Sequence, residues 1–334
     1  MPKKVWLLLE KELSEEPKEV DNIIIENKTR DGREVVSEDI IKKVSENQNI
    51  IPFIEIERTD PSGVNITVEA VEKGAKDIIL SSKSRTLLSV IALENIIART
   101  QKYKPNFYTF VNDLDEMRTA ARVLGIGTNI IVSDPSLVKS FKEYIAPINF
   151  ELVSAKVKES SRSLSADRCC IDTAEVMTRG EGMLVRSTGM CYFLVHAETE
   201  KTPHTDPRPS RCNCGPGSSY IITDLKPDGD ISTKYLHEVR HNSSVLIVDK
   251  NGTARRALVN RNKVENRPMR EIIASYNGED YPILLQDADS VYLTSKKGEP
   301  IPVTSCLGEE VLIYIASGTT HFGTQILQGR AREY

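Results

Sequence analysis

The chain has 334 residues, of which 39% are hydrophobic and 28% are charged, a composition typical of a globular protein large enough for two domains. Its formal net charge of -4, with both signs interspersed, leaves no basic patch, so we expect no nucleic-acid partner. No apolar run approaches the roughly eighteen residues of a membrane span, and the apolar start at residues 5–9 is too short for a signal peptide, so we expect a cytoplasmic protein without a membrane partner.

Short apolar runs alternate with amphipathic stretches along the first 155 residues. The apolar runs predict buried strands over residues 5–9, 23–25, 50–56, 77–80, 107–111, 129–132 and 150–153. The amphipathic stretches predict helices over residues 37–46, 66–74, 85–101, 113–124 and 135–144. Strands that alternate with helices indicate βα units. We therefore predict an α/β domain over residues 1–155, with a parallel sheet or a modified barrel.

No glycine-rich nucleotide loop opens any of these helices. The nearest match, Gly125-Ile-Gly127, lacks a third glycine and precedes a strand instead of following one. A standard Rossmann dinucleotide site is therefore not indicated, and neither is a Walker loop.

Residues 156–334 have a different pattern, with short alternating runs bounded by Gly, Asn, Asp and Pro. The runs predict strands over residues 182–185, 192–196, 219–222, 244–249, 255–259, 271–276, 283–286, 290–294 and 310–315. Lys250-Asn-Gly252 predicts a hairpin with a type I′ turn, and Lys296-Lys-Gly-Glu299 predicts a second hairpin. We therefore predict a β-rich second domain, built as a curled sheet or a barrel.

The six cysteines all lie in this second half, and none forms a Cys-x-x-Cys pair. The Cys212-x-Cys214 pair has no second pair with which to complete a structural zinc site. We interpret the cysteines as small buried thiols in a reducing compartment.

Glu181, His196 and Glu198 are candidate metal ligands. On a strand His196 and Glu198 point to the same side, and Glu181 follows a glycine at the start of an apolar run. Such a pair can bind a divalent metal or act as a base and its orienting group. The alternative is a strand whose polar face meets water.

Two further polar groups could bind an anion. Arg208, Arg211 and Asn213 follow in a Pro-rich segment, and a second group would share one face of an extended strand, namely Arg261, Lys263, Glu265 and Arg267. Arginine binds phosphate and carboxylate in a bidentate manner. The alternative is a solvated sheet face held by cross-strand ion pairs. His321, beside Gly323, is either catalytic or structural.

Seven short segments carry a resemblance to a known family. They are Leu93–Ala98, Gly180–Val185, Phe193–Glu198, Arg208–Gly215, Tyr235–Glu238, Lys263–Pro268 and His321–Gly323. In this order they resemble the type II 3-dehydroquinate synthases. The likeness covers nearly all of the second half and weakens toward the N-terminus.

The resemblance implies a lyase that closes a six-membered carbocycle by an intramolecular aldol-type attack. One branch of the family oxidatively deaminates a C7 amino-deoxy-ulosonate with NAD and cyclises it to 3-dehydroquinate. The other branch closes a C7 amino-keto phosphate to 3-amino-4-hydroxybenzoate, using a divalent metal such as Mn²⁺ and no net redox step.

Several positions depart from the family pattern. Ser218 replaces the family's histidine, Arg186 replaces a glycine, and Thr320 replaces an arginine before His321. Asp287 stands in a Leu-Gln-Asp segment where Leu-Gln-Asn is usual. The serine and this aspartate favour the 3-amino-4-hydroxybenzoate branch, and Arg186 would suit a phosphorylated substrate. The alternatives are the NAD-dependent synthase and a descendant that binds a small anion without catalysis.

From the resemblance we also derive hypothetical roles for the candidate residues. Glu181, His196 and Glu198 would hold Mn²⁺ or another divalent metal as a Lewis acid, with His321 as a fourth ligand. Lys263, a lysine between two arginines, would transfer a proton or form an imine, assisted by Glu265. Glu94 would act from the first domain. The ends of the C7 substrate would be bound by Arg208, Arg211, Asn213, Arg261 and Arg267. Homo-oligomerisation stays open.

Overall fold

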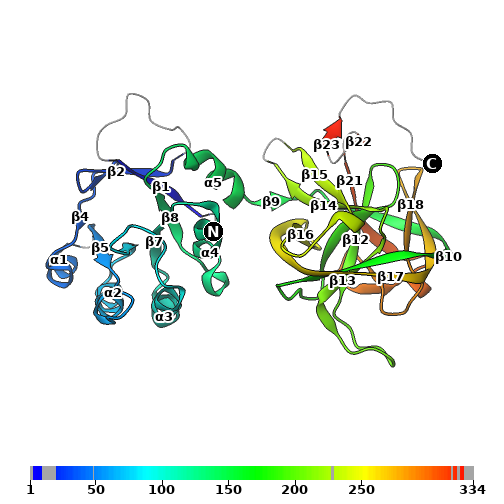
Figure 1. Cartoon of the computed structure of the whole chain (residues 1–334), viewed down its shortest axis with the longest axis horizontal. Coiled ribbons are helices and arrows are strands. Elements are labelled where there is room, and N and C mark those ends of the chain that lie inside the picture. The colour runs from blue at the N-terminus through cyan, green and yellow to red at the C-terminus, as the bar shows by residue number, and fades with distance from the viewer. Residues whose placement is uncertain are drawn as a thin grey trace. The chain divides into compact units, whose positions relative to one another are not determined.

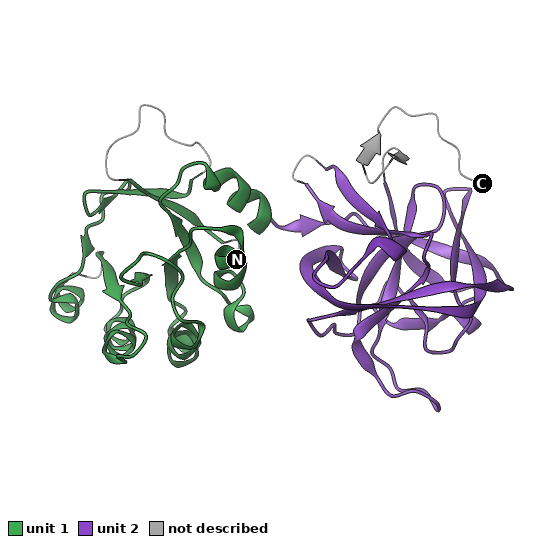
Figure 2. Ribbon diagram, in the orientation of Figure 1, with its two compact units in different colours: residues 1–146 green, residues 147–334 purple. Residues whose placement is uncertain are grey.

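The computed structural model describes residues 3–9, 20–47, 49–226, 229–316, 319–321 and 324–326. The chain divides into two compact units, Met1–Ala146 and Pro147–Tyr334 (Figure 2). This boundary precedes the one predicted at residue 155, because strand β9 (Ile148–Asn149) pairs with a long strand of the second unit.

Unit 1 is the predicted α/β domain. Its strands are β1 (Val5–Leu9), β2 (Asn22–Ile25), β3 (Lys28–Thr29), β4 (Val35–Val36), β5 (Ile51–Glu55), β6 (Asp77–Ser81), β7 (Asn106–Phe110) and β8 (Asn129–Val132). Its helices are α1 (Ile40–Glu46), α2 (Ser62–Glu72), α3 (Val90–Thr100), α4 (Leu114–Ala120) and α5 (Leu137–Ile145), with 3-10 turns η1 (Gln101–Tyr103) and η2 (Val123–Gly125). The strand order is β3-β2-β1-β8-β7-β6-β5-β4, and every pairing except β2–β3 is parallel.

The sheet of unit 1 curls into a nearly closed barrel. Each of its seven parallel strands contributes to one apolar cluster, formed by Trp6, Ile24, Val35, Ile51, Ile79, Tyr108, Phe110 and Ile131. The amide of Val35 also donates to the carbonyl of Asn27 at 2.8 Å, which brings β4 beside the turn that follows β2. Helices α1, α2 and α3 lie in a row outside the sheet (Figure 1). The modified barrel is therefore confirmed.

Helix α3 begins later than predicted. The residues before it form a loop in which Arg85 has a φ of 54°, a left-handed conformation that a helix cannot contain. The hydroxyl of Ser82 accepts from the amide of Thr86 at 3.0 Å and so holds this loop. The helix therefore starts at Val90 instead of residue 85.

Unit 2 consists of strands and short 3-10 turns. Its strands are β9, β10 (Val153–Thr173), β11 (Glu181–Arg186), β12 (Cys191–Glu198), β13 (Arg208–Pro216), β14 (Tyr220–Leu225), β15 (Ile231–Tyr235), β16 (Ser244–Asp249), β17 (Thr253–Tyr276), β18 (Glu279–Gln286), β19 (Tyr292–Thr294), β20 (Pro300–Pro302), β21 (Glu310–Ile315), β22 (Thr319–His321) and β23 (Thr324–Ile326). Its 3-10 turns are η3 (Leu236–Glu238) and η4 (Val303–Ser305).

A closed antiparallel ring forms the centre of unit 2. Strand β12 pairs with β13, then β10, β17, β16 and β11 follow, and β11 pairs back with β12. Closure leaves no free edge among these strands. Alternate residues of each strand fill the interior, among them Cys169, Ile171, Cys212 and Cys214. All six cysteines are free and buried, as predicted.

Three local expectations need correction. The hairpin at residues 250–252 is present, but only Gly252 has a positive φ, so the turn is not type I′. The predicted strands at 255–259 and 271–276 are parts of one strand, β17, because β10 pairs along most of its length. The strand predicted at 150–153 is divided between β9 and the start of β10.

No described helix is long and apolar enough to cross a membrane.

Candidate active site

The outer sides of three neighbouring strands, β13, β10 and β17, carry a continuous group of polar side chains. Cross-strand register places Asp172 between Arg211 and Arg261, and Cys170 between Asn213 and Lys263. One further step along, Arg168 lies opposite Glu265. We call this group the polar face; its members are Arg168, Cys170, Asp172, Arg211, Asn213, Arg261, Lys263 and Glu265. Alternation produces it on β10 and β13, where the intervening Cys169, Ile171 and Cys212 face the barrel interior.

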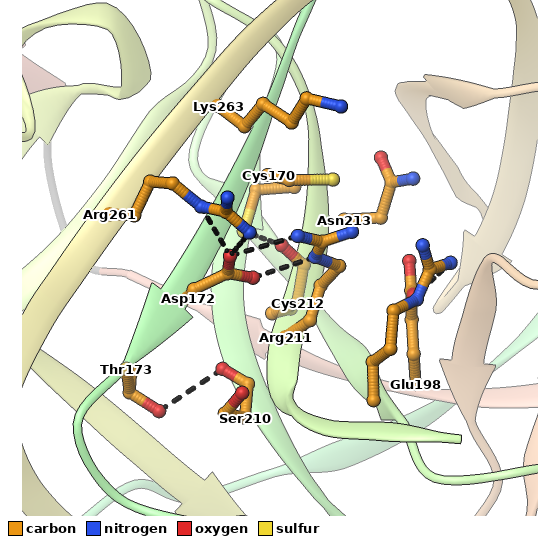
Figure 3. Close-up of polar contacts among 12 residues, drawn as sticks. Cys170, Asp172, Thr173, Glu198, Ser210, Arg211, Cys212, Asn213, Arg261 and Lys263 are labelled. Carbon is orange, nitrogen blue, oxygen red and sulfur yellow. Dashed lines mark hydrogen bonds and ion pairs between the residues drawn. The ribbon is translucent and has the colours of Figure 1, made fainter. Parts of the chain in front are cut away.

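Asp172 holds two arginines at the centre of the polar face (Figure 3). Its Oδ1 accepts from Nε of Arg211 at 2.6 Å, and its Oδ2 accepts from Nη2 of Arg211 at 2.8 Å. The same Oδ2 accepts from Nη2 of Arg261 at 2.6 Å. Burial alone would raise the pKa of Asp172, but the hydrogen bonds from Arg211 and Arg261 bring it below the ordinary value. The carboxylate therefore stays ionised and fixes both guanidinium groups.

Glu265 organises the other end of the polar face. It lies 2.9 Å from Nζ of Lys263, 3.0 Å from Nη2 of Arg168 and 3.1 Å from Nη2 of Arg267. Hydrogen bonds from Lys263 and Arg267 lower the pKa of Glu265 to about 2. Lys263 therefore has Glu265 as its ion-pair partner, and its role in proton transfer or imine formation stays a prediction.

Glu198, at the end of β12, adds a buried carboxylate beside the polar face. It is 2% exposed, and its Oε2 lies 2.5 Å from Nη2 of Arg208. Burial raises the pKa of Glu198, and the charges of Arg208 and Arg211 only partly oppose that effect. A carboxyl group with such a pKa can exchange a proton nearer to neutral pH than an ordinary glutamate does.

Two acceptor atoms at this place have no hydrogen-bond partner in the described part of the chain. They are Oε1 of Glu198 and Oδ1 of Asn213, both fully buried, whereas Oε2 of Glu198 has only the ion pair with Arg208. Two buried donors in the described residues, Nε of Arg168 and Nε of Arg208, also have no hydrogen-bond partner. The amide of Asn213 is oriented, since its Nδ2 donates to Oε1 of Gln286 at 2.9 Å. Buried polar atoms without partners are costly and call for a ligand or water that supplies a donor.

The combined arrangement suits a small molecule that carries both an anionic and a donor group. Six cations, Arg168, Arg208, Arg211, Arg261, Lys263 and Arg267, face three carboxylates, so the site keeps an excess of positive charge. A ligand carboxylate would meet the cations, and a ligand ammonium or hydroxyl would meet the two free acceptors.

Comparisons with known proteins relate the chain to one family. Residues 154–330, over half of the chain, match the model of the 3-dehydroquinate synthase II C-terminal domain. The chain is 38% identical over 257 residues to the 3-dehydroquinate synthase of Methanocaldococcus jannaschii, which covers 75% of this chain and 69% of that protein.

The chain belongs to the 3-dehydroquinate synthase II family.

Two other relatives bear the same name. The Methanopyrus kandleri protein is 38% identical over 249 residues, which cover 71% of this chain and 61% of the relative. The Nitrosopumilus maritimus protein is 34% identical over 260 residues, covering 76% of this chain and 71% of the relative. The alignment thus spans less than two thirds of the M. kandleri protein. The resemblance read from the seven segments is confirmed, and the chain is placed in an enzyme family.

Glu181, His196 and Glu198 were predicted to bind a metal. They do not form a metal site in the described residues. Both ring nitrogens of His196 are used by the backbone: Nε2 accepts from the amide of Gly180 at 2.8 Å, and Nδ1 lies 2.6 Å from the carbonyl of Ala197. Burial lowers the pKa of His196, which keeps the ring neutral. Glu181 accepts from Arg255 and from the amide of Thr178. These residues do not fit a divalent metal, and no described group of three His, Cys, Asp or Glu side chains does.

We expect His196→Asn to destabilise the barrel without changing metal affinity. The substitution leaves the buried Gly180 amide without its partner, which costs roughly 1–3 kcal/mol of unfolding free energy. Urea unfolding and the metal content of the purified protein measure the two effects. A lost manganese stoichiometry with unchanged unfolding would reinstate His196 as a ligand.

Two departures from the family pattern have structural explanations. Arg186 is 1% exposed, lies over the rings of Tyr192 and Tyr220, and donates to the carbonyl of Gly189. The carboxylate of Asp287 accepts from Arg270 at 2.8 Å. Arg186 is therefore not placed to hold a substrate phosphate, contrary to expectation, and Asp287 has a structural ion pair.

The remaining candidate residues are not members of the polar face. Glu94 lies half-buried in α3 of unit 1, so its catalytic role stays a prediction. His321 and Thr320 lie in β22, and their side chains are outside the described residues. Ser218 is exposed in the turn after β13.

The sequence analysis assigned no role to four residues that complete the site: Arg168, Cys170, Asp172 and Gln286. The first three alternate with the apolar Cys169 and Ile171, so period-two alternation along β10 was the available signal. Gln286 is revealed only by its hydrogen bond to Asn213.

Proposed function

We propose that this protein is a type II 3-dehydroquinate synthase that oxidatively deaminates a C7 amino-deoxy-ulosonate and cyclises the product. The observation that carries the proposal is the pairing of a cationic polar face with two buried free acceptors, Oε1 of Glu198 and Oδ1 of Asn213. An α-amino acid presents a carboxylate beside an ammonium, and this arrangement complements both. The names of the relatives support the same activity.

The polar face would orient the substrate through its carboxylate. Arg211 is fixed by Asp172 through two hydrogen bonds, so its remaining donor edge is already in place before binding. Arg208, Arg261 and Lys263 add positive charge around that edge. The substrate ammonium would then donate to Asn213 and Glu198.

Glu198 would take the proton of that ammonium. A neutral amine is required before the adjacent C–H bond can be oxidised. The hydrogen leaves that carbon with two electrons, the resulting imine adds water, and ammonium departs to leave a ketone. Nicotinamide dinucleotide would supply the two-electron acceptor that this oxidation requires.

Ring closure would follow in the same site. A carbon next to the original ketone loses a proton and attacks the new ketone, and the resulting alkoxide gains a proton. The guanidinium groups of Arg211 and Arg261 would stabilise that developing negative charge. Binding both ends of the flexible chain raises the effective concentration of the two reacting carbons.

The 3-amino-4-hydroxybenzoate reaction is less well supported. It was favoured by Ser218 and Asp287, and Arg186 was expected to suit its phosphorylated substrate. The side chains of Arg186 and Asp287 are occupied within the fold, and Ser218 is exposed in the turn after β13. The Mn²⁺ ligands it would need do not meet in the described residues.

One experiment tests the proposal directly. The purified full chain is incubated with NAD and the amino-ulosonate, and we expect reduced nicotinamide and 3-dehydroquinate to form in equal amounts, measured by absorbance and mass spectrometry. Formation of 3-amino-4-hydroxybenzoate from the C7 amino-keto phosphate with Mn²⁺ and without NAD would instead establish the other branch. Absence of product from both substrates would indicate a binding protein.

A further inference from the structure

An open pocket of about 560 Å³ lies within unit 2, between residues 237–241, at η3 and just after it, and residues 260–264 of β17. Four of its lining side chains are basic, namely His237, Arg240, His241 and Arg261, and none of the described lining residues is acidic. We call this pocket the basic notch. Its volume lies within the range of about 300–1,000 Å³ that small-molecule sites occupy. It adjoins the polar face, because Arg261 belongs to both.

Hydrogen bonds hold the two walls of the basic notch together. Nδ2 of Asn262, on β17, donates to the carbonyl of Leu236 at 2.8 Å and to the carbonyl of Val239 at 3.1 Å. The amide of Asn242 donates to the carbonyl of Val259, also on β17, at 2.8 Å. The segment after η3 is therefore fixed against β17, and the notch is formed before any ligand binds.

The backbone orients both histidine rings of the notch. Nδ1 of His237 lies 2.9 Å from the carbonyl oxygen of Gly217, and Nδ1 of His241 lies 2.9 Å from the carbonyl oxygen of Asn260. A carbonyl oxygen can only accept, so Nδ1 carries a proton in both rings. The ring of His237 also stacks on the ring of Tyr235, with 5.5 Å between the ring centroids. In each ring Nε2 is left for a ligand, and it accepts in the neutral ring and donates in the protonated one.

The two guanidinium groups of the notch are held through some of their donors only. Nη1 of Arg240 donates to the carbonyl of His237 and, at 3.4 Å, to the carbonyl of Val239. Nε and Nη2 of Arg261 donate to Oδ2 of Asp172 at 2.9 Å and 2.6 Å (Figure 3). Within the described part of the chain, Nε and Nη2 of Arg240 and Nη1 of Arg261 have no hydrogen-bond partner. The notch therefore offers oriented cationic donors to a ligand.

We infer that the basic notch binds a phosphate group, either as inorganic phosphate or on a small phosphate monoester. The charged oxygens of the phosphate accept from Arg240 and Arg261, the residue type that binds phosphate best. A hydrogen phosphate anion also carries a hydroxyl, which can donate to a neutral Nε2 of His237 or His241, whereas sulfate has no such hydrogen to donate. This binding does not depend on the proposed reaction.

Calorimetric titration of the full chain with inorganic phosphate, at about 150 mM salt to screen diffuse attraction, tests the assignment. We expect Arg240→Ala to raise the Kd about tenfold, because it removes a charge-assisted contact to phosphate. His241→Phe should raise the Kd by about threefold, since it keeps an aromatic ring but loses Nε2. The matched control is Lys234→Ala, an exposed cation of β15 outside the notch lining, which should leave the Kd unchanged. A lower Kd for glycerol 3-phosphate than for inorganic phosphate identifies a monoester as the ligand, and a higher Kd identifies the free anion.

Binding on the polar face instead of in the notch would give a different result. In that case Lys263→Ala, which removes a cation of the polar face that does not line the notch, would raise the Kd, and Arg240→Ala would leave it unchanged. That outcome would overturn the assignment. Sulfate that binds as tightly as phosphate, or no phosphate binding by the wild type, would also show that the notch does not recognise a phosphate group.

Discussion

Replacing Glu198 with Gln is expected to lower kcat by about 10²–10⁴-fold, the usual contribution of a general base. The amide cannot take the proton of the substrate ammonium, yet it keeps the size of the buried side chain. Binding of the substrate carboxylate should be little affected, because the cations of the polar face remain. Steady-state kinetics with the amino-ulosonate measure kcat and KM separately.

The pH profile provides a second readout for Glu198. Burial raises its pKa, so wild-type activity should fall as the pH drops through a value above that of an ordinary glutamate. The Gln variant should lose this acidic limb. The matched control is Glu200→Gln, two residues further along, where the carboxylate pairs with Arg179 instead. Unchanged kcat in the Glu198 variant would remove this residue from the catalytic machinery.

Replacing Asp172 with Asn is expected to lower the free energy of unfolding by about 2–4 kcal/mol. Asp172 is 7% exposed and Arg211 is 8% exposed, so the change leaves a buried guanidinium without its counter-ion. Arg261 is largely exposed and regains water, which limits the loss. Urea unfolding followed by circular dichroism measures the difference.

The pH dependence identifies the cause. The pKa of Asp172 is lowered in the folded state, so its stabilisation is fully present above the pKa of an unfolded aspartate and is lost as the pH falls through the lowered value. Wild type and Asn variant should therefore converge in stability in acid. The control Asp280→Asn removes a carboxylate that is half exposed, as is its partner Lys158, and a much smaller change is expected. A constant difference at every pH would contradict the ion-pair explanation.

Continuous apolar runs were sufficient to predict the strands that are buried on both faces. The run at residues 5–9 and the run at 129–132 are apolar throughout, and both proved to be central strands of the parallel sheet, covered on both sides. The first half was therefore predictable as βα units. Closure of the sheet into a barrel was less predictable, because it depends on which strands become neighbours.

The contacts between side chains could not be predicted from the pattern along one strand. His196 and Glu198 do alternate on one strand, as the pattern suggests, but a bulge separates Ala197 from Glu198 in the pairing with β13. His196 then meets the Gly180 backbone, and Glu198 meets Arg208. A shift of one residue in register redirects a side chain, and a local pattern does not contain that information.

The sequence by itself determined the family, the α/β and β-rich halves, and the residue types of a cationic site. Tertiary structure decided which of those residues act together, since Asp172, Arg211 and Arg261 come from three strands that only antiparallel register brings side by side. It also decided that Arg186 and His196 are structural. The reason is physical: alternation assigns a residue to a face, whereas its partners depend on which distant strand lies next to it.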